Sequence, residues 1–327
     1  MNKLWQNHPV IAIIGLSKNA GKTTTMNAFI ASTSERVALT SIGLDGEDYD
    51  QITALPKPQV MVRKGMIIAT ALDTLSKTDI EYKQLELLPW MTALGQIVII
   101  EVQSNGKVLL AGPATSKALT QTLKVLKKYC VKIIVDGAFN RKTLAYLEQF
   151  DGIVLAVGAS HHMHMHQTLN DAETIINQLQ FTASHVFTRK PAYSMIAIAP
   201  KKTYVSDVKN INRWTEWISK TPQIKHCYIR GAFTETWVKN IVKHRIQNLE
   251  FILDDATKLL IDHKHHQYMK TLNHQFTVIK PVKLILITLN PYSIYGTPYD
   301  STLFLTTAKK QFNLPVIDVY KGGVIYE

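Results

Sequence analysis

The sequence contains very little cysteine, with only Cys130 and Cys227 in a chain of 327 residues. Neither belongs to a Cys-x-x-Cys pair, which excludes a disulfide framework and fits a reducing compartment. Long apolar runs are missing too, because no stretch approaches the roughly 20 apolar residues that a membrane span requires. The N-terminus lacks the apolar core of a secretory signal. We therefore expect a cytoplasmic protein that does not enter a membrane.

Several functional signatures are absent as well. The sequence has no Gly-x-Gly-x-x-Gly fingerprint, and no Ser-His-Asp arrangement or zinc-ligand spacing can be assigned. The net charge of +12 raises the question of nucleic acid, but the basic residues are scattered and form only short pairs such as Lys127-Lys128. Dispersed charge is typical of a solvated surface or of attraction for an acidic partner. We do not expect nucleic acid to be the partner.

The most informative feature that is present lies near the start of the chain. The apolar run Val10 to Ile14 is followed at residues 15–25 by Gly-Leu-Ser-Lys-Asn-Ala-Gly-Lys-Thr-Thr-Thr. This order predicts a strand, a phosphate-binding loop and a helix, whose free N–H groups and positive dipole end attract phosphate oxygens. Met26, Phe29 and Ile30 follow at helical spacing and would lay that helix on a sheet. A nucleoside triphosphate is the expected ligand.

Each position of this loop carries an expected role. Lys22 would reach the β- and γ-phosphates as the catalytic cation, and the Thr23 hydroxyl would ligate Mg²⁺. The residues expected to contact the nucleotide are Gly15, Ser17, Lys18, Asn19, Ala20, Gly21, Lys22, Thr23 and Thr24. Five residues separate Gly15 from Gly21, whereas the usual motif has about four. Either Leu16 takes the first glycine position or the loop is one residue wider.

Two predicted strands end in a carboxylate that could reach the metal. One is Val98 to Glu101, and the other is Ile133 to Asp136. We favour Asp136 as the Mg²⁺ ligand, because Asp is the more common partner there and the following Gly137 allows close backbone approach. Glu101 remains the alternative metal ligand, or it acts on water or substrate. Either acid could instead be an ordinary charged residue at a strand end.

Further polar residues follow the second and third predicted strands. Asp45 is our catalytic candidate for orienting water or completing the Mg²⁺ shell, and Glu47 is the second choice. An acidic surface turn is the alternative, since Asp and Gly are also common turn residues. Arg63 and Lys64 would place cations at the same edge, where they could hold a phosphate or an acidic substrate.

A second unusual segment is the run His-His-Met-His-Met-His at residues 161–166. In an extended chain His162, His164 and His166 would share a face, and in a helix His162 and His166 would be neighbours. Imidazole and thioether groups can bind a transition metal. The run contains no cysteine or carboxylate and could also be polar loop filler, so metal binding stays open.

The first part of the chain alternates short β-branched runs with longer amphipathic segments, which is typical of a parallel sheet with crossover helices. Strands are predicted at 37–42, 59–62, 97–102, 107–110, 132–135 and 153–157, and helices at 22–33, 68–76, 115–129, 141–149 and 167–179. We expect an α/β fold in which residues 1–182 form a doubly wound, P-loop nucleotide-binding domain.

Residues 183–327 are expected to form a second α/β domain whose ligand is unknown. Strands are predicted at 195–199, 226–229, 251–253, 284–288 and 316–319, and helices at 205–219, 235–246 and 301–311. Polar strand ends at Arg230, Asp254 and Asn290 could form a ligand edge or could cap the helices that follow. No linker rich in Pro, Gly or Ser marks the boundary, so one continuous sheet remains open.

The motifs also carry two resemblances. The loop from Gly15 to Thr23 resembles that of dethiobiotin synthetase and other SIMIBI-class P-loop NTPases, and Val98 to Glu101 is similar to the glutamate-ended strand of that enzyme. Over most of the chain the sequence is more similar to proteins encoded beside lysine and ornithine aminomutases, the reactivase subunits of cobalamin-dependent enzymes. The segments that carry this second resemblance are Leu44 to Glu47, Lys57 to Ala71, Asp136 to Lys142, Asn290-Pro291 and Asp318.

These resemblances imply a Mg²⁺-dependent NTPase whose hydrolysis acts on a partner enzyme. ATP is favoured over GTP because the guanine-binding Asn-Lys-x-Asp motif is absent, and Ser17 stands where the MinD-like branch has its deviant lysine. A small-molecule kinase or ligase of the dethiobiotin synthetase kind is the alternative, and a binding module without hydrolysis is the third possibility. A homodimer remains open.

Overall fold

A computed structural model describes residues 6–42, 60–137, 149–206 and 210–320 of the chain. The chain divides into two compact units. Unit 1 comprises Met1–Thr168 together with Leu284–Glu327, and unit 2 comprises Leu169–Lys283. No helix in the described ranges is both long and apolar enough to cross a membrane.

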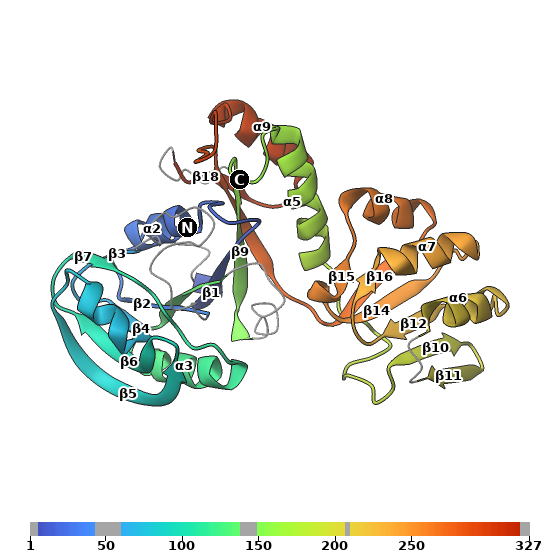
Figure 1. Cartoon of the computed structure of the whole chain (residues 1–327), viewed down its shortest axis with the longest axis horizontal. Helices are drawn as coiled ribbons and strands as arrows, with labels where there is room; N and C mark the ends of the chain where they lie inside the picture. The colour runs from blue at the N-terminus through green and yellow to red at the C-terminus, as the bar shows by residue number, and fades with distance from the viewer. Residues whose placement is uncertain (1–5, 43–59, 138–148, 207–209, 321–327) are drawn as a thin grey trace. The chain divides into compact units, whose positions relative to one another are not determined.

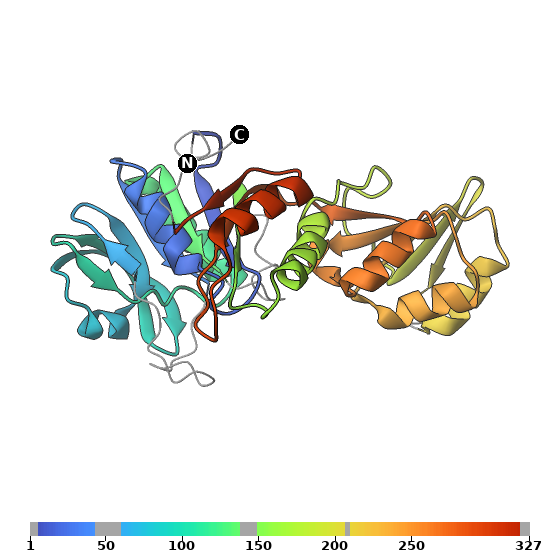
Figure 2. The same ribbon diagram turned by 90° about the horizontal axis from the view of Figure 1, so that it is seen from above.

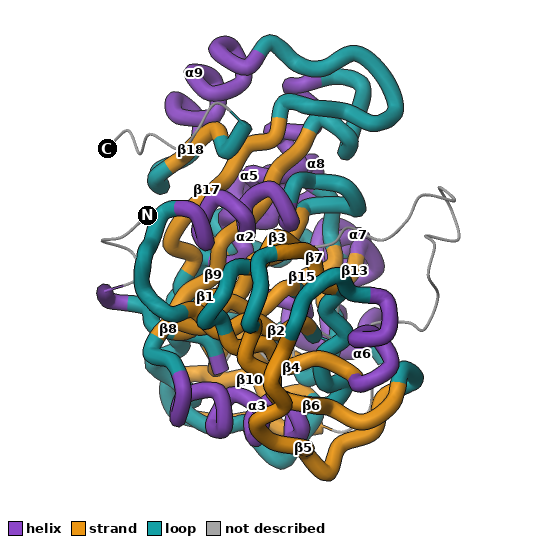
Figure 3. The backbone as a smooth tube through the Cα atoms, turned by 90° about the vertical axis from the view of Figure 1, so that its left-hand side faces the viewer, coloured by secondary structure: helices purple, strands orange, loops and turns teal. Residues whose placement is uncertain are grey.

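Unit 1 contains a nine-stranded, mostly parallel sheet. Its strands are β1 (Val10–Gly15), β2 (Val37–Ser41), β4 (Ile67–Ala71), β5 (Tyr82–Thr92), β6 (Gly95–Val102), β8 (Lys132–Asp136), β9 (Gly152–Gly158), β17 (Leu284–Asn290) and β18 (Val316–Asp318). Their order is β18-β17-β9-β1-β8-β2-β4-β6-β5 (Figures 1 and 3). Only β6 runs against its neighbours, since it pairs antiparallel with both β4 and β5. The expected α/β fold with a parallel sheet is confirmed.

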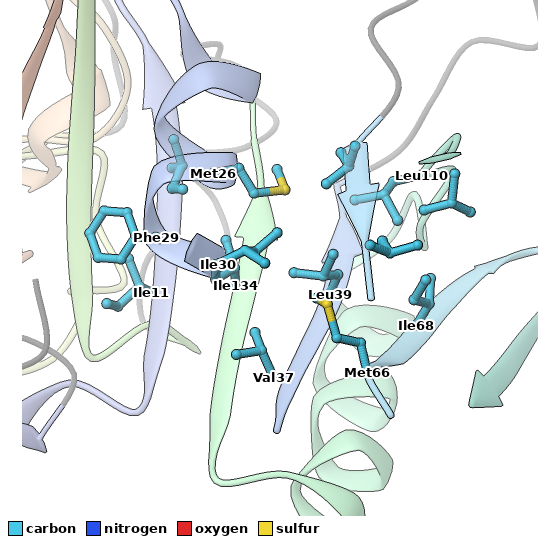
Figure 4. Packing of buried hydrophobic residues seen from close by; sticks show 14 of the residues in the cluster. Ile11, Met26, Phe29, Ile30, Val37, Leu39, Met66, Ile68, Leu110 and Ile134 are labelled. Carbon is cyan, nitrogen blue, oxygen red and sulfur yellow. The ribbon is translucent and has the colours of Figure 1, made fainter. Parts of the chain in front are cut away.

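Helices cover both faces of this sheet. Helix α2 (Lys22–Ala31) buries Met26, Phe29 and Ile30 against one face, on residues such as Ile11 of β1 (Figure 4). Helix α3 (Ser116–Tyr129) packs on the opposite face. The alternation of side chains along each strand therefore tells which face a residue occupies. The other elements of unit 1 in the described ranges are η1 (Leu72–Lys77), the paired strands β3 (Val60–Val62) and β7 (Gly106–Val108), and α9 (Ser301–Gln311).

One predicted helix of unit 1 is a strand. Residues 68–76 were expected to be helical, but Ile67–Ala71 forms β4, and only the short 3-10 helix η1 follows it. Strand β4 lies between β2 and β6 with every residue buried, so its sequence shows no alternation that would distinguish strand from helix. The edge strand β5 was not predicted. The helix expected at 141–149 falls almost wholly outside the described residues.

The last part of the chain returns to the first sheet. Strand β17 pairs in parallel with β9, and β18 pairs with β17. The sequence had placed both segments in a second domain that starts at residue 183, because nothing in a single sequence marks an insertion between two parallel strands. Asn290 and the residues after it therefore belong to the same sheet edge as the end of β1.

Unit 2 contains a five-stranded mixed sheet of order β11-β10-β12-β14-β16. The strands are β10 (Met195–Ala199), β11 (Lys202–Ser206), β12 (His226–Ile229), β14 (Glu250–Asp255) and β16 (Gln275–Lys280). The α-helices are α6 (Ile211–Ser219), α7 (Glu235–Lys243), α8 (His263–Thr271) and α5 (Met165–Leu179), the last of which crosses the unit boundary. The unit also contains the short 3-10 helix η3 (Ala256–Lys258) and a two-stranded parallel pair, β13 (Phe233–Thr234) with β15 (Leu259–Leu260). A helix was predicted at 205–219, but residues 205 and 206 belong to strand β11, and helix α6 begins at Ile211.

The two faces of this second sheet differ in character. One face packs against the helices (Figure 2). In the core on this face, Cys227 and Phe251 of the sheet cluster with Trp237 and Met269 of the helices. The other face carries a smaller apolar cluster that includes Tyr228. By alternation, the acidic residues of β14 at positions 250 and 254 lie on this second face.

Helix α8 contributes a histidine, His266, that is buried in unit 2. His266 is only 2% exposed, its Nδ1 has no hydrogen-bond partner in the described part of the chain, and burial lowers its pKa to about 4. Its ring lies 6.5 Å from that of Phe181 and 6.5 Å from that of Phe276. The neutral imidazole is therefore the form that the folded protein accommodates.

We expect the stability of unit 2 to fall as the pH drops from about 6.5 towards 4. In this window the unfolded chain binds a proton at His266 that the folded chain does not, so stability increases with pH. The contribution is at most roughly 3 to 4 kcal/mol, since one pKa unit corresponds to about 1.4 kcal/mol. Urea unfolding followed by tryptophan fluorescence should show a flatter pH dependence in His266→Leu. The control His244→Leu should keep the wild-type slope; equal slopes in all three proteins would contradict this account.

Candidate functional site

The loop between β1 and α2 forms the centre of the candidate site. Strand β1 ends at Gly15, the Leu16 N–H donates to the Ala156 carbonyl at 2.9 Å, and α2 begins at Lys22. Gly21 is the N-cap in a left-handed conformation with φ of 97°, and it offers no side chain to cap the helix. The first N–H groups of α2 are thus suited to an anion.

The side chain of Lys22 folds back across the end of β1. A Cβ atom placed on Gly15 would lie 3.0 Å from Cγ and 3.2 Å from Cδ of Lys22. Glycine at position 15 therefore makes room for the lysine stem. The Lys22 side chain therefore packs closely against Gly15, which favours Gly15 over Leu16 as the first glycine position of the motif. With Gly15 in that position, the loop is one residue longer than the usual motif.

The ends of β9 and β17 enclose the loop. A Cβ on Gly158 would lie 2.7 Å from the carbonyl oxygen of Ala20, and a Cβ on Gly21 would lie 2.7 Å from Cβ of Asn290. The Asn19 side-chain amide donates to the Tyr295 hydroxyl at 3.3 Å. The loop is consequently held by backbone and side-chain contacts with the neighbouring strands.

Asp136 lies at the end of β8, the strand beside β1. It is opposite Ile13 in the parallel pairing, and it shares the α2 face of the sheet because Ile134, two residues earlier, packs in the α2 cluster. Its Oδ1 is buried and has no hydrogen-bond partner among the residues that the structure describes. Burial raises the pKa of Asp136, and the nearby positive charge of Lys22 opposes that rise. A buried carboxylate oxygen without a partner is the donor that a hard cation such as Mg²⁺ requires.

Thr23 and Thr24 lie in the first turn of α2, and both are half-buried. The next residue, Thr25, is fully buried, and its hydroxyl is 2.7 Å from that of Thr288 on β17. This contact fixes the start of α2 against the sheet. Thr23 directly follows Lys22 in the first turn of α2, so it lies at the same edge of the sheet as Asp136 at the end of β8.

Glu101 does not come to this edge. It is opposite Ile67, the first residue of β4, so it lies at the other end of the parallel strands. Alternation with Ile99 places it on the α3 face, and its Oε1 accepts a hydrogen bond from Arg36. The metal and catalytic roles considered for Glu101 therefore have no geometric support, because β6 runs antiparallel and carries its end away from Lys22.

The other predicted site residues have different outcomes. Asp45 and Glu47 lie outside the described residues. Arg63 does not serve the ligand edge, because its guanidinium donates to the carbonyls of Thr33 and Glu35, just after α2. The Arg63 guanidinium is thus turned towards the C-terminal end of that helix.

The histidine-rich segment joins β9 to α5. The His164 N–H donates to His162 Nδ1 at 3.1 Å, and the His162 carbonyl accepts from the Tyr299 hydroxyl. In the parts of the chain that the structure describes, the clusters of three potential metal ligands lie in unit 2, and none of them includes this segment. Metal binding by residues 161–166 stays a prediction.

Three contacts of the site were not predicted from sequence. Asn290 against Gly21, Thr288 with Thr25, and Tyr295 with Asn19 all involve the residues of β17 or the loop after it. The strand itself was predicted, but its place in the sheet was not. The fully buried run of β17 is the signal that it belongs to a parallel sheet with neighbours on both sides.

Comparisons with models of protein families, with curated proteins and with solved structures find no match. What can be stated of the chain's class is that it is an α/β protein with a large, mostly parallel sheet and a second, mixed sheet. Its function has to be inferred from the chemistry of the residues around Lys22 and Asp136.

Proposed function

We propose that the protein binds Mg²⁺–ATP at the β1–α2 loop and hydrolyses it, coupling the reaction to a change in a partner protein. The observation that carries this proposal is the buried, unpartnered Oδ1 of Asp136 on the strand next to the loop, within electrostatic range of Lys22. A cation and a metal-ready carboxylate meet there beside an uncapped helix N-terminus. A triphosphate with its magnesium needs this combination.

Each group has a distinct role in the proposed reaction. The N–H groups at the start of α2 bind phosphate oxygens, and Lys22 binds the β- and γ-phosphates as a point charge. Thr23 and Asp136 would hold Mg²⁺, which bridges phosphate oxygens and offsets the charge that develops during transfer. Burial of Asp136 keeps competing water away from the ligand atom and fixes its direction.

Three tyrosines near the loop support a nucleotide over a bare phosphate. Tyr292, Tyr295 and Tyr320 are each more than half exposed, and the rings of Tyr292 and Tyr320 are stacked with centroids 5.4 Å apart. Exposed aromatic rings beside a phosphate site offer a surface on which a base can stack. The absence of Asn-Lys-x-Asp favours adenine over guanine.

The coupling to a partner protein rests on the resemblance to reactivase subunits of cobalamin-dependent enzymes, so a partner of that type is the first to test. The kinase or ligase alternative has less support. It needs cations for an acidic substrate, and Arg63, one of its two candidates, binds carbonyl groups after α2 instead.

The backbone packing around the loop gives a direct prediction. Gly158→Ala should weaken ATP binding by about 10- to 100-fold, because the new methyl group displaces the loop and a shift on the order of 1 Å has effects of that size. The matched control is Gly296→Ala, where a Cβ meets nothing within 4 Å. Equilibrium binding of a fluorescent ATP analogue measures both; equal affinity in the two variants would contradict the packing argument.

Measuring phosphate release from ATP by the purified full chain tests the proposed reaction. We expect release of inorganic phosphate with Mg²⁺ and without any metabolite, and a faster rate when a cobalamin-dependent aminomutase is added. A kinase or ligase would release little phosphate until its substrate is supplied. Absence of turnover with either ATP or GTP, with and without such a partner, would overturn the proposal.

A further inference from the structure

Unit 2 brings three metal-ligating side chains together at one end of its sheet. His185, His226 and Glu250 each offer one ligand atom, and these atoms all lie within 4.8 Å of one another. The cluster is formed entirely within unit 2 by residues that are far apart in sequence. It is separate from the β1–α2 loop and plays no part in the proposed nucleotide chemistry.

The topology of the sheet explains how two of the ligands meet. His226 begins β12, Glu250 begins β14, and the parallel pairing sets these two residues directly opposite each other. Directly opposed residues have their side chains on the same face of a sheet. This is the face that carries Tyr228 and Ile252 and that is turned away from α7 and α8.

The third ligand comes from the chain between α5 and β10. The Ser184 N–H donates to the Val278 carbonyl at 2.8 Å, which fixes this segment beside β16. The ring of the next residue, His185, forms a T-shaped pair with the His226 ring, with centroids 5.7 Å apart and planes at 84°. The backbone hydrogen bond from Ser184 to Val278 thus positions the His185 imidazole beside the His226–Glu250 pair.

Glu250 is an acidic side chain that is almost fully buried. It is 8% exposed, its Oε1 accepts from the Thr277 hydroxyl at 2.5 Å, and its Oε2 is 2.5 Å from His226 Nδ1. Within the described residues, His226 is the only basic side chain within ion-pair distance of it. Burying a carboxylate is costly unless a positive charge compensates it, and a divalent cation supplies such a charge.

We propose that His185, His226 and Glu250 bind a divalent transition metal, with Zn²⁺ as the best fit. Two imidazoles and one carboxylate are a known zinc ligand set, and three protein ligands leave a fourth position for water or another ligand. His185 is exposed, so that fourth position is open to solvent. The Thr277 hydroxyl orients the carboxylate, as groups behind metal ligands commonly do.

The distances require only a small adjustment. Zinc bonds of about 2.0 to 2.2 Å place tetrahedral ligand atoms roughly 3.3 Å apart. The contact between His226 and Glu250 would lengthen by less than about 1 Å as the metal replaces their direct hydrogen bond. The exposed His185 ring can close the remaining gap, because its side chain is not packed in the core.

The other described cluster of potential ligands is a weaker candidate. Glu235 is exposed, and Asp262 is already engaged as the N-cap of α8, accepting from both the backbone N–H and Nδ1 of His265 at 2.7 Å. These bonds satisfy Asp262 without a cation. The proposal therefore concerns the His185–His226–Glu250 cluster alone.

Zn²⁺ titration of the full chain against a chromophoric chelator tests the site. We expect one tight zinc equivalent per chain, and a loss of affinity of more than about 100-fold in His185→Ala, which removes one of three ligands from an exposed position. Glu250→Gln, which keeps the shape and the contact with Thr277, should show the same loss. Far-UV circular dichroism verifies that both variants are folded.

The control removes histidines elsewhere. The double variant His162→Ala with His164→Ala should keep the tight zinc equivalent, because the histidine-rich segment is not part of the cluster. Co²⁺ added in place of Zn²⁺ should give a visible spectrum that disappears in His185→Ala. Tight binding that survives in His185→Ala, or that disappears in the double variant, would overturn the proposal. This readout does not involve ATP and is independent of the nucleotide site.

Discussion

Replacing Lys22 with alanine is expected to weaken ATP binding by about 10- to 100-fold, since one charge-assisted hydrogen bond to phosphate contributes about 1.5 to 3 kcal/mol. The lysine stem lies across Gly15, and its charge acts at Asp136, so the ammonium group is directed at the loop. Removing it leaves the N–H groups of α2 as the main phosphate ligands. Turnover should fall below detection, because both the ground state and the transition state lose this contact.

Lys64→Ala is the matched control for Lys22→Ala. Lys64 is an exposed lysine of the same unit, and it follows β3, which pairs with β7 and not with the main sheet. Its removal changes the net charge by the same amount. Isothermal titration with ATP should give wild-type affinity for Lys64→Ala; wild-type affinity for Lys22→Ala would instead refute the assigned phosphate contact.

The second large effect is expected at Asp136. Asp136→Asn should reduce turnover by about 100-fold or more, the usual size of effect when one preorganised group is lost from a reacting centre. Binding of ATP in the presence of EDTA should change little, because Lys22 and the helix N-terminus remain. The affinity gained on adding Mg²⁺ should largely disappear. Calorimetric titrations with and without Mg²⁺ separate these two contributions.

The same substitution should stabilise the protein in the absence of ligands. Burial raises the pKa of Asp136, so the unfolded chain loses this proton at a lower pH than the folded chain does. The folded state consequently loses stability as the pH rises from about 3.8 through the folded pKa. Asparagine has no such ionisation. Asp136→Asn should therefore unfold at an equal or higher urea concentration than the wild type at pH 7; clear destabilisation would contradict this explanation.

Glu101→Gln separates the two strand-end acids. It removes the ion pair with Arg36 at the opposite edge of the sheet, where Arg36 Nε also donates to the Gly65 carbonyl at 2.7 Å. A partly exposed pair of this kind contributes about 1 kcal/mol or less. We expect wild-type turnover and Mg²⁺ dependence in Glu101→Gln. A loss of turnover as large as that in Asp136→Asn would contradict this assignment and would indicate that Glu101 is the metal ligand.

The sequence predicted secondary structure most accurately where the local residue pattern was enough to identify the element. The apolar run of β1, the loop and the amphipathic α2 all follow from spacing, and so do the ends of β10, β12 and α9. Strand β4 was misassigned because it is buried on both faces, and burial removes the period-2 signal. Strands β11 and β16 were missed because both lie at an edge of the sheet of unit 2 and bury few side chains, so their apolar signal is weak.

The candidate site was predictable in part for a similar reason. Lys22, Thr23 and Asp136 follow from motif spacing and from the rule that parallel strands share a ligand edge. Glu101 ends an apolar strand just as Asp136 does, and the direction of a strand cannot be read from its own sequence. Asn290 reaches Gly21 only because the chain returns to the first sheet after unit 2. Such a return is a property of the whole topology.

The most direct test of the central proposal is saturation binding of a non-hydrolysable ATP analogue to the wild-type full chain, with and without Mg²⁺. We predict one site per chain with an affinity in the range of about 1 to 100 μM, equivalent to roughly 5.5 to 8 kcal/mol, and weaker binding in EDTA. The analogue should protect the β1–α2 loop from hydrogen exchange. Failure to observe saturable binding at millimolar analogue, with Mg²⁺ present and the protein folded, would contradict the proposal.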